Sequence, residues 1–158
     1  LCRERMLHRI ASARPVSVGM LEGYQLVIHK RSIDGSGKAN AHYTGQPNHV
    51  TWGAIYQISR EHKPLLDQIE FVGVGYDTIE VDVVLATGES VRAWTYVARS
   101  AAITDGLKPY AWYKTLVVRG ALQHRLPSDY IRRLETIEAT PDHDAARRQR
   151  NLGVINAA

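Results

Sequence analysis

The chain has 158 residues, 44% of them hydrophobic and 23% charged, with a formal net charge of +4. This length fits one domain, and no apolar run reaches the roughly 18 residues that a membrane span needs, so we expect no membrane contact. Cys2 is the only cysteine, which excludes an internal disulfide and favours a cytoplasmic setting.

The first elements are a helix, a strand and a loop. Residues 3–9 favour a helix, because apolar side chains recur there at three- and four-residue spacings. A stretch rich in β-branched and aromatic residues then predicts a strand at 24–31. Residues 33–40, IDGSGKAN, predict a glycine-rich loop. Its Gly-Lys pair does not complete a nucleotide-phosphate motif, because Ser32 and Ala39 stand where that motif needs Gly and Ser or Thr.

Histidines follow this loop in polar surroundings. His42, His49 and His62 lack the spacing of a metal-binding helix face or a zinc knuckle, so we expect surface side chains and no metal site. The alternating sequence VTWGAIYQI predicts a core strand at 50–58. Further on, TIEVDVVL and ESVRAWTYVA predict two strands that pair as a hairpin.

Between the predicted 50–58 strand and this hairpin lies the stretch KPLLDQIEFVGVGY, around which we organise the chain. Pro64 suits the first turn of a short helix, and Gly73 makes its continuation unfavourable. Glu70 falls at the margin of the apolar face and is followed at once by Phe71. We therefore expect its carboxylate to lie among apolar groups, which raises its pKa and suits proton exchange near neutrality. The alternative, a solvated residue ending a surface helix, stays open.

The last third of the chain is helical. Residues 109–125 predict a long helix with Tyr113 on its core face, and Ser128 is positioned to cap a second helix. Strands joined by short turns, followed by helices, predict an α+β domain on a curved or barrel-like, mostly antiparallel sheet. We assign 1–140 to this single domain and 141–158 to a C-terminal tail.

The positive charge is partly concentrated in that tail, at Arg147, Arg148 and Arg150. A nucleic-acid interface needs a broader basic face interleaved with aromatic residues, so we expect no nucleic-acid partner.

Several segments occur in a fixed order with short spacers: RERMLHRIASARPV, LEGYQL, VTWGAIYQI, LLDQIEFVGVGY and YKTLVVRGALQHRLPSDYIRRL. Together they resemble the γ-glutamylcyclotransferase family, over nearly all of the chain up to about Leu134. The resemblance implies an enzyme that cleaves a small γ-glutamyl amide or amine into 5-oxoproline and a free amine. This amide-cleaving, lyase or acyltransferase chemistry belongs to glutathione metabolism and uses neither a metal nor an organic cofactor.

The resemblance also implies the site residues. Glu70 matches the catalytic glutamate, and Tyr113, Tyr76 and Leu1 match substrate-binding positions. The family usually has glycine after the glutamate, where this chain has Phe71, which narrows or reshapes the expected pocket. The family's tyrosine-glycine-serine-asparagine loop would end just before Leu1, so we expect a strand and loop upstream. A second hypothesis is an inactive small-molecule or peptide-binding module of the same fold.

Overall fold

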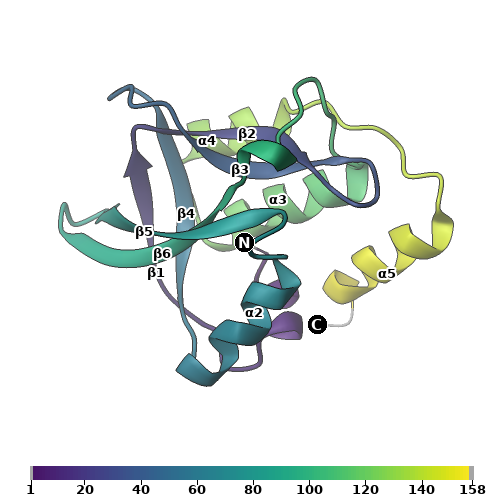
Figure 1. The fold of residues 1–158 in the computed structure, drawn as a ribbon. Helices are drawn as coiled ribbons and strands as arrows, with labels where there is room; N and C mark the ends of the chain where they lie inside the picture. Colours follow the sequence, from purple (N-terminus) through teal and green to yellow (C-terminus); the bar gives the residue numbers. More distant parts are fainter. Residues whose placement is uncertain (1, 157–158) are drawn as a thin grey trace.

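The computed structural model describes residues 2–156 (Figure 1). Its helices are α1 (Arg3–Arg9), α2 (Lys63–Ile69), α3 (Ala111–Gln123), α4 (Ser128–Glu135) and α5 (Ala145–Asn156). Its strands are β1 (Arg14–Glu22), β2 (Tyr24–Arg31), β3 (Gly37–Tyr43), β4 (Val50–Gln57), β5 (Tyr76–Leu85) and β6 (Ser90–Ala98). Short 3₁₀ turns precede α2 and follow β6, at Arg60–His62 and Ser100–Ala102.

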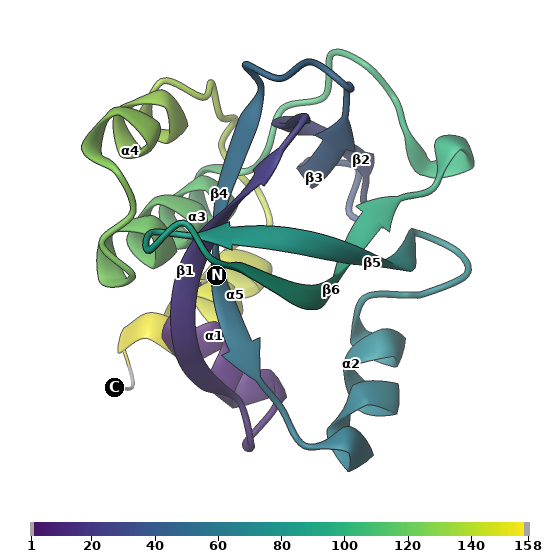
Figure 2. The ribbon, with the colours of Figure 1, turned by 90° about the vertical axis from the view of Figure 1, so that its left-hand side faces the viewer.

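The strands form an antiparallel sheet of order β4-β1-β5-β6 and a separate β2-β3 ribbon. β1 pairs with β4 along its length but meets β5 at only two residue pairs, so the β5–β6 hairpin crosses β1 steeply (Figure 2). Gly19 lies at this crossing. A Cβ there would stand 2.5 Å from Cγ1 of Val83, so glycine permits the close approach.

Side chains join the ribbon to the larger sheet at two seams. The Thr51 hydroxyl donates to the Tyr24 carbonyl (3.0 Å), which ties β4 to β2. The amide N–H of Ala98 donates to Oδ1 of Asn40 (2.8 Å), which ties β6 to β3. Thr51 and Asn40 are both buried, and these bonds satisfy polar groups that would otherwise destabilise the interior. The result is the curved, barrel-like antiparallel architecture that the sequence predicts.

Helices α3 and α4 pack against the strands and supply most of the largest apolar cluster: Val117, Ala121, Leu126, Tyr130 and Leu134. A second cluster joins α1, α3 and α5 through Cys2, Trp112, Leu116 and Ile155. The segment assigned to a C-terminal tail therefore contains a helix that packs on the domain (Figure 1). Asp142 anchors it, because its carboxylate accepts from Trp112 Nε1 (2.8 Å) and from Arg147 Nε (2.7 Å).

Local sequence patterns misassigned three details. The sequence patterns predict no strand at the position of β1. They predict a loop over 33–40, but strand β3 begins at Gly37 and takes up the second half of that stretch. Both strands are stabilised by pairing with distant strands, which outweighs their weak strand propensity. Ser128 does not cap α4: Pro127 holds the N-cap position, and no side chain bonds there.

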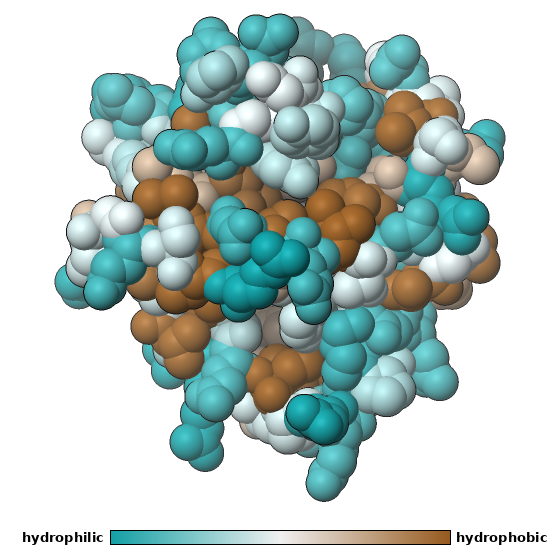
Figure 3. Space-filling view, turned by 60° about the vertical axis from the view of Figure 1, so that its left-hand side comes forward, coloured by the Kyte–Doolittle hydropathy of each residue, from teal (hydrophilic) through white to brown (hydrophobic). Residues whose placement is uncertain are grey.

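Hydrophobic and hydrophilic side chains are interspersed on the protein surface. On the face drawn in Figure 3, several apolar groups are separated by hydrophilic side chains. The large apolar side chains that remain exposed include Val16, Ile33, Leu65, Phe71 and Val74. Within residues 2–156, no helix combines the length and hydropathy required to cross a membrane.

Candidate active site

The end of α2 fixes the backbone of Glu70. Glu70 is the C-cap residue, and Phe71 then adopts a left-handed conformation with φ of 54°. The Phe71 carbonyl accepts the N–H groups of Val74 (3.0 Å) and Gly75 (2.8 Å), so the following loop closes tightly around it. A left-handed backbone suits glycine best, which gives a physical reason for the glycine that the resemblance implies at the Phe71 position. Phe71 is 52% exposed and lies at the surface beside Glu70.

The Glu70 carboxylate is paired with a cation. Arg9 Nη1, on α1, donates to Glu70 Oε1 at 2.7 Å, and the two side chains are 28% and 23% exposed. The predicted apolar surroundings are therefore wrong, because α1 brings a guanidinium to the carboxylate. Among residues 2–156, Glu70 Oε2 has no hydrogen-bond partner. One oxygen is thus held by Arg9, while the other can accept a hydrogen bond from a ligand.

The two tyrosines predicted to bind substrate meet at one residue of β3. The Ala39 N–H donates to the Tyr113 hydroxyl (3.1 Å), and the Tyr76 hydroxyl donates to the Ala39 carbonyl (3.0 Å). Burial raises the pKa of Tyr113, and the Glu70 carboxylate raises it further. Burial also raises the pKa of Tyr76, with contributions from Tyr113 and Glu70. Both phenols therefore stay protonated at neutral pH and lie in the electric field of Glu70.

Lysine and aromatic side chains support Tyr113 from the β2–β3 side. Lys38 Nζ lies 3.0 Å from Oδ2 of Asp34, and 4.9 Å and 5.0 Å from the ring centroids of Tyr113 and Trp112. Asp34 also accepts from the Ser36 hydroxyl at 2.7 Å. This network links the β2–β3 turn to the start of α3. It fixes the ring of Tyr113 by contacts that are individually weak but share one ammonium group.

Further cations approach the site from α1 and β2. The Arg5 guanidinium lies 5.8 Å from the Trp112 ring centroid and donates to Oδ1 of Asn151 (2.9 Å) on α5. Burial lowers the pKa of Arg5, and the charge of Arg9 lowers it further. Lys30, on β2, is buried, and its Nζ lies 4.9 Å from the Tyr76 ring centroid. The site is thus a cationic region around one glutamate.

Sequence reasoning did not anticipate Arg9, Lys30 or Ala39 at this site. Arg9 lies in a helix whose pattern predicts only a packed face, and Lys30 lies in an ordinary strand pattern. Ala39 falls in the stretch predicted to be a loop. Leu1, the remaining predicted substrate-binding residue, lies outside the described residues.

The histidines for which the sequence predicts no metal site, His42, His49 and His62, are not among the residues described around Glu70. Nδ1 of His62 lies 2.7 Å from the Ser12 hydroxyl, and Nδ1 of His49 lies 2.9 Å from the Thr44 hydroxyl. Within the described part of the chain, no three His, Cys, Asp or Glu side chains come together as a metal-binding group.

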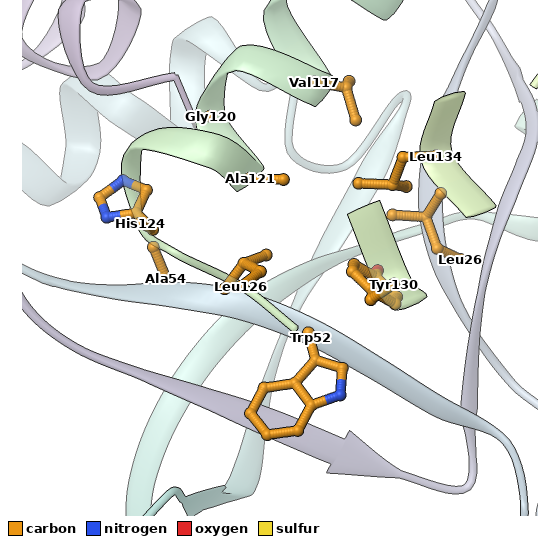
Figure 4. Close-up of a pocket in the computed structure, with 10 residues that line it drawn as sticks. All are labelled: Leu26, Trp52, Ala54, Val117, Gly120, Ala121, His124, Leu126, Tyr130 and Leu134. Atoms are coloured by element: carbon orange, nitrogen blue, oxygen red, sulfur yellow. The ribbon is translucent and has the colours of Figure 1, made fainter. Parts of the chain in front are cut away.

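A small cavity lies away from Glu70, between α3, α4 and the strands (Figure 4). Its volume is only about 10 Å³, too small for a substrate. In Figure 4 the side chains of Ala121, Leu126, Tyr130 and Leu134 converge on it. It contains none of the predicted site residues and belongs to the packed core.

A curved antiparallel sheet wrapped by helices, with a paired glutamate at the end of a short helix, defines a γ-glutamylcyclotransferase-like α+β fold. The solved structure of a γ-glutamyl cyclotransferase superposes with a TM-score of 0.85 at 23% identity, covering 99% of this chain and 92% of that chain. An uncharacterized protein from Homo sapiens superposes with a TM-score of 0.81 at 24% identity, covering 94% and 90%. These two likenesses show the fold.

The sequence comparisons identify the family. A model of the AIG2-like family matches residues 50–134, more than half of the chain, and the chain belongs to that family. Relatives named γ-glutamylcyclotransferase from Homo sapiens and Bos taurus are 26% and 27% identical to it over 146 residues. These alignments cover 87% of this chain and 74% of each relative. The family predicted from the ordered sequence segments is confirmed.

Proposed function

We propose that this protein is a γ-glutamylcyclotransferase, which acts in the cytoplasm on small γ-glutamyl amides or amines. The products are 5-oxoproline and a free amine or amino acid. The observation that carries the proposal is the Glu70 carboxylate. One oxygen is fixed by Arg9, the other has no hydrogen-bond partner among residues 2–156, and two protonated tyrosines lie in the electric field of the carboxylate. Relatives that bear this activity as their name support it.

The substrate supplies much of the rate enhancement. The α-amine of a γ-glutamyl group reaches its own side-chain carbonyl and closes a five-membered ring. Intramolecular attack in a well-oriented geometry is worth roughly 7 to 11 kcal/mol of the barrier. The protein must then hold the substrate in the cyclising conformation and move protons.

Glu70 acts as general base and then as general acid. Its carboxylate takes a proton from the α-ammonium, and the resulting amine attacks the γ-carbonyl carbon. The new C–N bond forms as the carbonyl becomes a tetrahedral oxyanion. When the bond to the leaving nitrogen breaks, that nitrogen takes the proton from Glu70. The second proton leaves the attacking nitrogen by the same route, so the lactam keeps one N–H and the departing amine leaves as an ammonium ion.

Tyr113 and Tyr76 are the proposed substrate-binding residues. Each hydroxyl is held on the peptide groups of Ala39, so the two phenols are fixed relative to one another. Fixed polar groups bind a reacting molecule without reorganisation during the reaction. We expect them to align the glutamyl chain toward Glu70.

The experiment that tests the proposal measures 5-oxoproline release. The purified protein is incubated with γ-glutamyl amino acids, γ-glutamyl amines and glutathione, and 5-oxoproline is quantified by chromatography. We expect time-dependent release from at least one substrate, in equal amount to the free amine. A protein that binds these compounds but releases no 5-oxoproline would instead be a binding module.

That second function is favoured by one observation. The Arg9 guanidinium holds the Glu70 carboxylate at 2.7 Å, and a carboxylate held in this way can bind the ammonium group of a ligand without transferring a proton. In a module without turnover, the same pair would simply orient a bound amine. Equilibrium binding of a γ-glutamyl compound without product formation over hours would support this alternative.

A further inference from the structure

Lys30 is a largely buried cation with no counter-ion in contact among the described residues. The residue is 8% exposed, and among residues 2–156 the structure shows no hydrogen bond or ion pair of its Nζ. The Nζ is not one of the fully enclosed unpaired atoms of the described residues, so a ligand can reach it. Its closest described interaction is with the Tyr76 ring, 4.9 Å from Nζ to the centroid. Buried ammonium groups are normally paired, because an unpaired charge is costly to remove from water. An unpaired one therefore points to a ligand.

The fold directs this ammonium at the Glu70 loop. The β2–β3 pairing shifts register between Ile28 and Lys30, and such a bulge re-aims the side chains next to it. At the other end, a Cβ on Gly75 would stand 2.9 Å from Lys30 Cε and 3.0 Å from Nζ. The same point lies 3.8 Å from the Glu70 carbonyl oxygen. Gly75 thus leaves room for the lysine beside the catalytic segment.

Other charges do not neutralise this group. Burial lowers the pKa of Lys30, and the more distant carboxylates of Glu70 and Asp34 offset part of the shift. Asp34 is in contact with Lys38, and Glu70 is in contact with Arg9. Of these three cations, Lys30 is the one whose charge remains available to a ligand.

The chemistry of a γ-glutamyl group supplies the matching anion. Its α-carbon carries both the attacking amine and a carboxylate, so an amine that faces Glu70 brings a negative charge close to another negative charge. A neighbouring ammonium offsets that repulsion. On the basis of the proposed function, we propose that Lys30 binds the substrate's α-carboxylate and so makes a free α-carboxylate a requirement for substrates.

The test compares ligands that differ only in this group. Wild-type protein and Lys30→Met, which keeps the apolar stem, are assayed with a γ-glutamyl substrate and with its α-carboxamide. We expect Lys30→Met to raise KM for the free carboxylate about 10- to 100-fold, the range of a hydrogen bond to a charged group. KM for the carboxamide should change less than about threefold, and kcat should change little with either substrate. Lys30→Arg should recover part of the loss.

A binding measurement separates this inference from the proposed activity. Calorimetric titration with 5-oxoproline and with 5-oxoprolinamide requires no turnover. Loss of the preference for 5-oxoproline in Lys30→Met supports the carboxylate site even where no product is ever released. Lys108→Met, which removes an exposed charge paired with Glu138, serves as the control and should leave both affinities unchanged.

Three results would overturn the inference. An equal loss of kcat with both substrates would assign Lys30 to the reacting carbonyl or to proton transfer. An equal loss of affinity for both ligands, with a lower melting temperature, would make Lys30 a structural residue. Unchanged KM and unchanged ligand preference in a folded Lys30→Met variant would show that Lys30 has no role in carboxylate binding. Release of 5-oxoproline by the same preparation would still support the proposed enzymatic activity.

Discussion

Helix α3 borders two regions of opposite character. Val117 and Ala121 face the small cavity beneath α4, where nearly every contact is apolar. Tyr113 and Trp112, one to two turns earlier, face Lys38 and the cationic region around Glu70. In the first region, shape complementarity decides the free energy, because dispersion contacts depend on filled space. In the second, the pairing of charges decides it, and one cation is left over for a ligand.

The largest expected difference between activity and stability is at Glu70, in the charged region. Glu70→Gln keeps the size of the side chain but abolishes proton exchange, so kcat should fall about 10²- to 10⁴-fold. The melting temperature should change little, since the side chain is partly exposed and the glutamine amide oxygen can still accept the hydrogen bond from Arg9. Steady-state kinetics and a thermal melt on the same preparation check both expectations. Retention of more than about a tenth of the wild-type kcat would assign the proton transfer to another residue.

The apolar region should respond in the opposite way. Leu134 is 4% exposed, and Leu134→Ala should lower the free energy of unfolding by about 2 to 5 kcal/mol. KM and kcat measured well below the new melting temperature should stay within about twofold. Leu122, 55% exposed on α3, provides the matched control, because Leu122→Ala should cost less than about 0.5 kcal/mol. A large kinetic effect of Leu134→Ala would show that the regions are coupled.

A separate charged contact, at Glu4 on α1, should respond to acid. Burial raises the pKa of Glu4, but hydrogen bonds from Arg119, Cys2 and Gln123 outweigh it and lower the pKa from 4.5 to about 2. A lowered folded-state pKa gives stability that is complete above about pH 4.5 and lost as pH falls toward about 2. The stability difference between wild type and Glu4→Gln should therefore shrink across this window. Urea titrations at several pH values measure it; a constant difference would contradict the assignment.

The smallest effect concerns left-handed backbone. Phe71 and Arg125 have φ of 54° and 53°, a conformation that costs a non-glycine residue roughly 1 to 2 kcal/mol. Phe71→Gly and Arg125→Gly should each stabilise the protein by up to about 1 kcal/mol, since glycine's greater unfolded-state entropy offsets part of the relief. Only Phe71→Gly, next to Glu70, should also change KM. Denaturation curves and KM values for both variants test these expectations. Equal effects of the two substitutions on KM would show that Phe71 does not lie beside the bound substrate.

Sequence alone determined the elements whose signals are local. The 3–9 helix, the β5–β6 hairpin and the short α2 follow from periodicity, turn residues and the Pro64 and Gly73 boundaries. These signals involve residues a few positions apart, so they need no knowledge of the rest of the chain. They were enough to place Glu70 at the end of a helix, whereas the family was suggested by the resemblance of the ordered segments.

Tertiary structure decided the surroundings of that glutamate. Arg9 reaches Glu70 across 61 positions, and Tyr113 reaches Ala39 across 74. Lys30 fits beside Gly75 only because β2 and the Glu70 loop fold against one another. β1 and β3 likewise become strands by pairing with distant partners. Periodicity records which face of an element is buried, but not which charge meets it, so the electrostatics of the site arise only when the chain closes into the barrel.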